Sequence, residues 1–390
     1  MADNRSSDIL GTRCEKVKVK DLPDTMYGFS TEEIMESLLL PVRLHSNGMI
    51  NLTGLEMDPD VFPMIEEFAM KLRGKLDCKP SPLYRLATGG SISYKIVPER
   101  IRSKLMRTRM KAREVNLYGK IGLEEIRNKF LKNLGLRKTN PNGNICFLTH
   151  DIDSEKGLRK ALRLKMIEEK YDIESTWFIS TEEYILDKTI VKRLAENGEV
   201  ASHGTKHDGK LLSLGEGKLV KELRKSKEKL EEITEKEIHG FRTPLLQYNG
   251  KLLEAIGESG FKYDSSVPAW EPMHPFTMKP DGIELINPIT INGLLEIPVT
   301  LPQDHQMLHI LGLTPKQTVK LWTEMIEYVY KMGGIPVILV HPDYELSNKE
   351  NIEHYENLLR SAKIIRGMSK AICLLFRGFD SSSLLSGRPS

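Results

Sequence analysis

From residue 144 onward, strand-like and helix-like segments alternate along the chain, and this alternation constrains the fold more than any other feature. Apolar or β-branched runs such as 145–150, 175–180 and 334–341 are separated by segments with helical spacing of apolar residues, such as 156–171. About seven or eight such βα units favour a barrel over an open sheet. The sequence therefore predicts an α/β fold with its chemistry at the carboxyl ends of the strands.

Polar side chains stand at nearly every predicted strand end, where a folded barrel does not itself need them. Four of the ten histidines of the chain fall in this small set. The strand ends read, in chain order, His150-Asp151-Ile152-Asp153, Ser202-His203 continuing to His207, Arg242-Thr243-Pro244, Tyr263-Asp264, and Val340-His341-Pro342-Asp343.

His203 and His207 have the spacing of a metal site, because residues four apart on a helical turn face the same way. The spacing alone is also typical of two ordinary surface or core histidines. A carboxylate from another strand end favours the metal, since two histidines and one aspartate leave a coordination position open for water. Asp153 is the natural third ligand.

Asp151 is then free for a different task. Two aspartates spaced i, i+2 at a strand end can serve different partners, one binding the cation and the other accepting a proton from water. Arg242 at another strand end could hold that base ionised and oriented. The alternative for Arg242 is a salt bridge that only ties two strands together.

The order Thr-His-Asp-Ile-Asp, His-Gly-Thr-Lys-His, Arg-Thr-Pro and Leu-Val-His resembles that of the polysaccharide deacetylases, carbohydrate esterase family 4, also called NodB-like. The resemblance covers roughly residues 143 to 380 and implies a distorted, incomplete (β/α) barrel. It implies that Asp151 is the catalytic base and that Arg242 steadies it. It also implies that His341 protonates the leaving amine and that the backbone N–H of Leu245 stabilises the oxyanion. The implied metal ligands are Asp153, His203 and His207.

Several positions depart from the usual family pattern. Ile152 separates the two aspartates, which resembles a D-x-D branch of the family, and Leu245 replaces an aromatic residue. Asp264 is the candidate for the acidic partner of His341, although capping or turn formation by its Asp-Ser-Ser run is the alternative. About 75 residues separate Asp264 from His341.

Further residues are predicted to shape the substrate site. Trp270, flanked by Pro268 and Pro272, could stack against a sugar ring, with ordinary packing as the alternative. Pro244 and Leu245 are predicted to contact substrate. His305 and His309 share the four-residue spacing, and we interpret them as loop residues of the substrate groove, not as a second metal site.

The chain divides by character into three parts. Residues 1–95 are predicted to form a smaller α+β module, with strand-like pieces at 38–45 and 48–55 and a helix at 61–76. Residues 96–142 are predicted to be a basic helical connector, and residues 143–385 the barrel of about seven strands. From 99 to 140 there are 13 lysines and arginines against four glutamates, which indicates a solvated helix face or a contact for an anionic surface.

Composition excludes several classes of protein. A net charge of +3 without a recognition motif does not favour nucleic acid. No window resembles a membrane span or a secretory leader, so the expected location is cytoplasmic, with peripheral membrane contact through 99–140 as an option. The four cysteines lack metal or disulfide spacing and are expected to be buried thiols.

Together these features predict a metal-dependent hydrolase that removes an N-acetyl group from an amino sugar. The ligand set favours Zn²⁺, with Co²⁺, Ni²⁺ and Mn²⁺ as alternatives. The expected substrate is an N-acetylated saccharide or a lipid- or nucleotide-linked sugar. Two alternatives stay open: a hydrolase of another amide or O-acetyl ester, and an inactive glycan-binding protein that keeps the metal pocket.

Overall fold

The computed structural model describes residues 17–46, 55–80, 101, 104, 107, 118–136, 144–271, 278–279, 282–364, 367–369 and 372. Its centre is a nine-stranded sheet in the order β12-β13-β10-β9-β8-β7-β6-β14, with β15 also paired to β6. Every pair is parallel except β12–β13. The strands are β6 (Asn144–Ile152), β7 (Thr176–Ile179), β8 (Glu199–Ser202), β9 (Gly240–Phe241), β10 (Tyr263–Asp264), β12 (Ile289–Ile291), β13 (Leu294–Glu296), β14 (Val337–Val340) and β15 (Gly367–Ser369).

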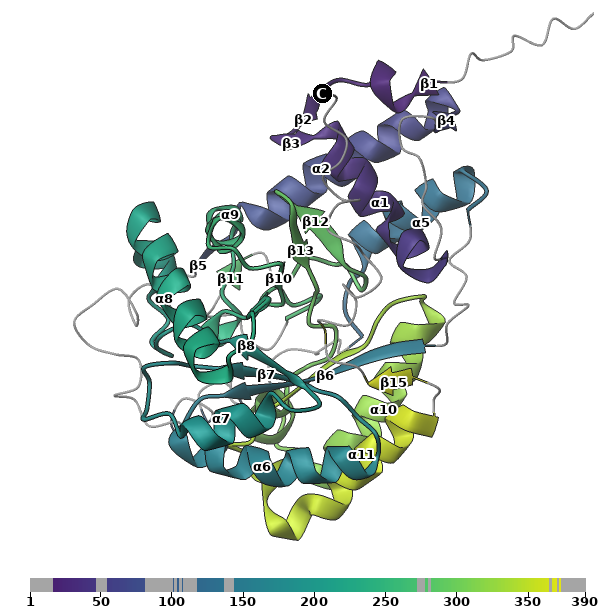
Figure 1. Ribbon diagram of the computed structural model, residues 1–390. Helices are drawn as coiled ribbons and strands as arrows, with labels where there is room; N and C mark the ends of the chain where they lie inside the picture. The colour runs from purple at the N-terminus through teal and green to yellow at the C-terminus, as the bar shows by residue number, and fades with distance from the viewer. Residues whose placement is uncertain are drawn as a thin grey trace, which may run out of the picture.

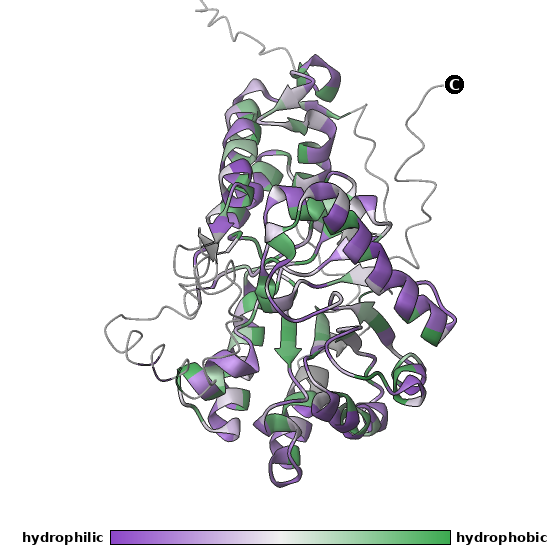
Figure 2. Cartoon of the chain, turned by 90° about the vertical axis from the view of Figure 1, so that its left-hand side faces the viewer, coloured by the Kyte–Doolittle hydropathy of each residue, from purple (hydrophilic) through white to green (hydrophobic). Residues whose placement is uncertain are grey.

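The predicted α/β barrel-like fold is confirmed, as a curled, incomplete barrel with nine strands in its sheet where about seven were predicted. Helices connect the parallel strands, and Figure 1 shows α6, α7, α10 and α11 along one side of the sheet. These connecting helices are α6 (Glu155–Lys170), α7 (Lys188–Leu194), α8 (Glu216–Thr234), α9 (Gly250–Glu258), α10 (Pro315–Lys331) and α11 (Ile352–Ile364). In Figure 2 the hydrophilic colour lies mainly on the helices, and apolar colour marks the strands between them.

Local sequence explains where these helices begin. Ser154, Asp187 and Asn249 are N-caps whose side chains accept hydrogen bonds from backbone N–H groups of the first turns of α6, α7 and α9. Thr314 and Gln317 form a capping box at α10, with Pro315 in its first turn. Capping residues therefore mark where each of these four helices begins.

The N-terminal part contributes helices α1 (Thr31–Ser46), α2 (Phe62–Leu76) and α5 (Gly122–Asn133), which Figure 1 shows above β12 and β13. Short strands β1 (Val17–Lys18), β2 (Thr25–Met26), β3 (Phe29–Ser30), β4 (Glu56–Met57) and β5 (Lys79–Pro80) border them. Strands β1 and β2 pair with β4 and β3, and β5 pairs with β11 (Met278–Lys279). The domain boundaries at residues 95 and 142 stay predictions.

One N-terminal prediction was wrong. Residues 38–45 were expected to be strand-like, but they lie in helix α1, which contains Pro41. Taken alone, this apolar run is typical of a strand. The Thr-Glu-Glu sequence at residues 31–33 precedes it and provides a helix N-terminus with acidic residues in its first turn. Residues 48–54 and most of the basic connector lie outside the described residues.

Buried apolar side chains fill both the sheet and the N-terminal helices. The largest buried cluster runs without interruption from Phe29 and Phe68 in the N-terminal part to Trp177 and Trp322 in the barrel. Cys78 and Cys146 are buried free thiols, as predicted, and burial raises the pKa of each to about 12. Among the described helices, none is long and apolar enough to cross a membrane.

Candidate active site

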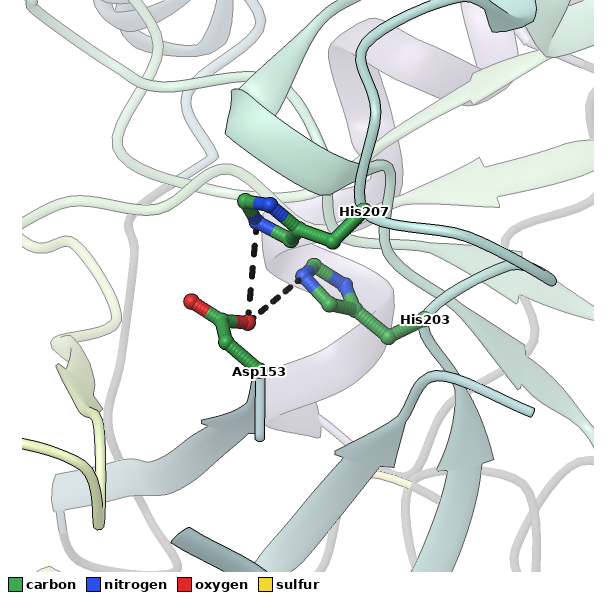
Figure 3. Close-up of side chains that lie close together, drawn as sticks. All are labelled: Asp153, His203 and His207. Atoms are coloured by element: carbon green, nitrogen blue, oxygen red, sulfur yellow. Dashed lines mark ion pairs between the residues drawn. The ribbon is translucent and has the colours of Figure 1, made fainter. Parts of the chain in front are cut away.

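Asp153, His203 and His207 converge at the carboxyl ends of β6 and β8. The Oδ1 atom of Asp153 lies 3.5 Å from Nε2 of His203 and 3.6 Å from Nε2 of His207, as Figure 3 shows. This Oδ1 atom is buried and accepts no hydrogen bond from the described residues. Burial alone would raise the pKa of Asp153, but His207, His203 and His341 lower it below its usual range. A carboxylate and two imidazole nitrogens that face one point are a donor set suited to a divalent metal ion.

Neighbouring groups fix His203, the more deeply buried of the two metal-site histidines. Nδ1 of His203 lies 2.8 Å from the backbone carbonyl oxygen of Arg242, so it carries the proton and donates it there. Nε2 of His203 then presents its lone pair toward Asp153, which is the tautomer that a metal ligand needs. The backbone N–H of His207 donates to the Glu183 carboxylate at 2.9 Å, which holds the start of its loop.

Asp151 lies beside this group on the same strand end and is almost completely buried, with 3% of its surface exposed. A guanidinium N–H of Arg242 donates to Asp151 Oδ1 at 2.9 Å and to Thr149 Oγ1 at 2.8 Å. The backbone oxygen and hydroxyl of Ser265 accept the other Arg242 hydrogen bonds, at 2.7 and 2.8 Å, and the guanidinium lies over the ring of Phe178. This network fixes the arginine, so Asp151 is held as an oriented carboxylate.

His341 follows β14, and the sheet register brings it next to Asp151. Val340 pairs with His150, so the next residue of each strand is His341 on β14 and Asp151 on β6. Nε2 of His341 lies 3.9 Å from Oδ2 of Asp153. The other oxygen of this carboxylate, Oδ1, is the one that faces His203 and His207. Both candidate proton-transfer groups therefore border the same point.

Asp304 holds His341 from behind, and the sequence did not single it out for this role. Its Oδ1 lies 2.6 Å from Nδ1 of His341, and its Oδ2 accepts the backbone N–H of His341 at 2.7 Å. Burial would lower the pKa of His341, but Asp304, followed by Asp153 and Asp151, raises it to about 10. The only signal in the sequence is an aspartate shortly after the strand-like run at 294–300, inside the long stretch before His341.

Asp264 lies elsewhere, in a fully buried position between Ser266 and Glu296. Its two oxygens accept hydrogen bonds from the hydroxyl and the backbone N–H of Ser266, at 2.6 and 3.1 Å. The partner that the structure gives to His341 is thus Asp304, and Asp264 packs under the Arg242 network through Ser265 and Ser266.

The three residues predicted to contact substrate lie in different surroundings. Leu245 has φ 63° and ψ 19°, a left-handed conformation that is unfavourable for leucine and often marks a functional turn. Pro244 is buried beside Gly204 in the loop between His203 and His207. Trp270 packs closely against Gly119 and lies under the ammonium group of Lys120.

One other acidic residue near the site is Asp343, which the sequence placed at a strand end without giving it a role. Asp343 accepts hydrogen bonds from the backbone N–H of Asp153, at 3.3 Å, and from the hydroxyl of Ser154. A side chain on Gly157 would collide with this carboxylate, so the glycine makes room for it. Asp343 therefore supports the loop that carries Asp153.

Residues 138–263 match the sequence profile of the family Polysaccharide deacetylase. This segment belongs to that family. It contains Asp151, Asp153, His203, His207 and Arg242, and the members of the family are hydrolases that act on N-acetyl amide bonds.

Several solved structures are similar to this chain. A Mycobacterium smegmatis protein assigned to the polysaccharide deacetylases is 19% identical with a TM-score of 0.51, over 65% of this chain and 96% of that one. A family 4 carbohydrate esterase from Streptomyces lividans, solved with acetate, is 15% identical with a TM-score of 0.40, over 58% and 92%. The catalytic domain of a peptidoglycan N-acetylglucosamine deacetylase from Eubacterium rectale gives 15% and 0.40, over 60% and 90%. No curated protein matches the chain.

Proposed function

We propose that this polysaccharide deacetylase domain removes the N-acetyl group from an amino sugar in a saccharide or glycan precursor, with a divalent metal ion at Asp153, His203 and His207. The observation that carries the proposal is the buried Asp153 Oδ1 atom, which accepts no hydrogen bond from the described residues and faces two imidazole Nε2 atoms. A carboxylate in this state fits a cation, because an unsatisfied buried charge is otherwise costly. The donor set favours Zn²⁺ over Co²⁺, Ni²⁺ or Mn²⁺.

A bound divalent ion would lower the pKa of a water molecule in the site and polarise the acetyl carbonyl. Asp151 accepts the proton of the attacking water, since the hydrogen bond from Arg242 fixes one of its oxygens and leaves the other free to face the water. The backbone N–H of Leu245 stabilises the oxyanion, at a turn where Leu245 has a left-handed backbone conformation.

His341 donates a proton to the departing amine. Its raised pKa keeps the imidazolium charged at neutral pH, so the proton is available when the C–N bond breaks. The small apolar cluster of Leu246, Val299 and Leu339 lies on elements that end at the site and suits the methyl group of the acetyl substituent. Acetate and a free amino sugar are the products.

The first experiment measures metal content and acetate release from a panel of N-acetylated saccharides, including lipid- and nucleotide-linked sugars, with and without chelator. Chelator-sensitive acetate release is expected. Asp151→Asn should keep the metal and lose roughly 10³-fold in rate, whereas His203→Ala should lose both metal and activity. His239→Ala is the matched control, because His239 precedes β9, at the end of the strand opposite the site, and its ring lies 3.6 Å from the Glu237 carboxylate. A near-wild-type rate for Asp151→Asn would remove the base assignment, and release from O-acetyl esters alone would identify an esterase.

A further inference from the structure

The segment between β7 and α7, residues 180–187 and here called the β7 loop, lies beside the turn that carries the two metal-site histidines. The backbone N–H groups of Thr181 and Glu182 donate to the carbonyl oxygens of Gly204 and Thr205 at 3.0 and 2.7 Å. These two bonds extend the pairing of β7 with β8 past the ends of the strands. The β7 loop therefore runs directly along the backbone that joins the two histidines.

Two consecutive side chains of the β7 loop reach different parts of the metal site. The Glu183 carboxylate accepts the backbone N–H of His207 at 2.9 Å. The hydroxyl of Tyr184 donates to the backbone carbonyl oxygen of Ile152 at 3.0 Å, directly before Asp153. Burial, followed by the nearby charge of Asp153, raises the pKa of Tyr184 well above its usual value, so the hydroxyl keeps the proton that it donates. Neighbouring positions of one loop thus hold a histidine ligand and the strand end of the aspartate ligand.

The peptide group between Ile152 and Asp153 is held at both of its polar atoms. Tyr184 donates to its oxygen, and the Asp343 carboxylate accepts its N–H at 3.3 Å. Because a peptide group is planar and its oxygen and N–H point in opposite directions, these two bonds fix the orientation of the plane. The plane in turn sets the direction in which the Asp153 side chain leaves the backbone, and so the position of its buried Oδ1 atom.

We propose that Glu183 and Tyr184 form a clamp that positions His207 and Asp153 to bind the divalent ion. This inference rests on the proposed function, because it assigns the ion to those ligands. Both clamp residues act through the ligands, since the group with metal-ligand geometry in the described part of the chain is Asp153, His203 and His207. Groups that orient metal ligands change metal affinity by roughly 10- to 100-fold. The clamp therefore determines how tightly the site holds its ion.

The alternative is that the clamp serves only to fold the β7 loop, but the loop has other anchors for that purpose. The backbone bonds of Thr181 and Glu182 hold its start. Asp187 holds its end as the N-cap of α7, where the carboxylate accepts N–H groups of the first turn. An ion pair at 2.7 Å also joins Glu182 to Lys225 of α8. These anchors remain when the clamp is removed, so its variants are expected to fold.

The test measures the Kd for Zn²⁺ in competition with a chromophoric chelator, and the visible absorption of the Co²⁺-loaded protein, which depends on ligand geometry. Tyr184→Phe and Glu183→Ala should each raise the Kd about tenfold and change the Co²⁺ spectrum. Glu183→Gln should bind nearly as tightly as the wild type, because its amide oxygen still accepts the N–H of His207. Ile185→Ala is the control on the same loop, since Ile185 is 85% exposed, and it should change neither measurement.

An unchanged Kd and an unchanged Co²⁺ spectrum in both Tyr184→Phe and Glu183→Ala overturn the inference. A lower melting temperature of the metal-free variants without a change in Kd also overturns it, because that result identifies a purely structural role. Acetate release by the wild-type protein separates the clamp from the proposed reaction. If the Kd depends on the clamp but no saccharide is deacetylated, the clamp stands and the reaction fails. If acetate is released and the Kd does not change in the variants, the reaction stands and the clamp fails.

Discussion

Asp304 accepts two hydrogen bonds from His341 and is completely buried, so its charge acts on the acid at short range. In Asp304→Asn the charge is lost. In either orientation of its side chain, the amide NH₂ group would also face one of the two N–H donors of His341. We expect kcat to fall about 100-fold with little change in KM or metal content. Steady-state kinetics and metal analysis check this, with the exposed Asp172→Asn as control. Loss of the metal together with kcat would show instead that Asp304 supports the ligands.

The buried pair Asp264 and Glu296 predicts a pH dependence of stability. The two residues are in register on β10 and β13, and Glu296 Oε2 accepts no hydrogen bond from the described residues. Burial raises the pKa of both, and that of Glu296 well above 4.5, so the folded pair retains a proton. The stabilisation that comes from this retained proton is complete below the pKa of the carboxyl group in the unfolded state. It is lost as the pH rises through the higher pKa of the folded state.

Glu296→Gln keeps a donor toward Asp264 and an acceptor for the N–H of Val267 but cannot ionise. We expect the free energy of unfolding of this variant to rise relative to that of the wild type by about 1.4 kcal/mol for each pH unit between the unfolded-state and folded-state pKa values, because one proton is involved. Urea unfolding at pH 5 and pH 8 measures the difference, with the exposed Glu228→Gln as control. A difference that does not grow with pH would mean that the pair is ionised in the folded state.

The residues of the site differ in how far the sequence could predict them. Asp151, His203 and Arg242 follow short apolar runs, and the carboxyl ends of parallel strands meet at one edge, so their convergence was predictable. Asp304 follows a stretch without clear periodicity, and its pairing with His341 depends on how that stretch folds back. The resemblance to the deacetylases instead suggested Asp264, which lies on β10.

At the scale of elements, β6 carries the base on one face and a buried histidine–carboxylate contact on the other. His150 stacks on Trp177 at 4.0 Å, and its Nδ1 lies 3.2 Å from the backbone oxygen of Val340. Its Nε2 lies 3.0 Å from Glu168 of α6, which also accepts hydroxyl hydrogen bonds from Ser175 and Tyr355. His150 therefore ties β6 to β14 and to α6, at the strand positions that precede Asp151 and His341.

Replacement of His150 by phenylalanine should destabilise this junction, because it leaves the Glu168 carboxylate buried without the imidazole nitrogen that contacts it. We expect the free energy of unfolding to fall by about 3 kcal/mol. The double variant His150→Phe/Glu168→Gln should recover part of the loss, since it removes the buried charge. Urea unfolding of both variants provides the comparison. A single variant as stable as wild type would show that His150 contributes only the packing of its ring.

Helices were more predictable than strands. The charged, amphipathic segments of the barrel became helices α6 to α10 nearly as predicted, because spacing and capping residues agree there. The error at residues 38–45 came from a leucine-rich run interrupted by Pro41, whose helical state depends on packing against β12, through Ser37 and Thr290. Tertiary contacts of this kind are not visible in a local pattern.

At the scale of the whole molecule, the N-terminal helices share one core with the barrel. Arg127 on α5 is fully buried, pairs with Glu124, and donates to the backbone oxygens of Asn287 and Pro288, just before β12. Its guanidinium also lies over the ring of Phe68 on α2. The sequence predicted a smaller α+β module at residues 1–95, and these contacts join α2 and α5 to the sheet.

We therefore expect the N-terminal helices and the barrel to unfold in one transition. Arg127→Leu leaves Glu124 buried and uncompensated, which should lower the free energy of unfolding by about 3 kcal/mol and shift the whole heat-capacity peak to lower temperature. Lys129→Ala, an exposed site on the same helix, is the control and should shift it little. If Arg127→Leu instead splits the peak, with one part at the wild-type temperature, the barrel unfolds independently of the helices above β12.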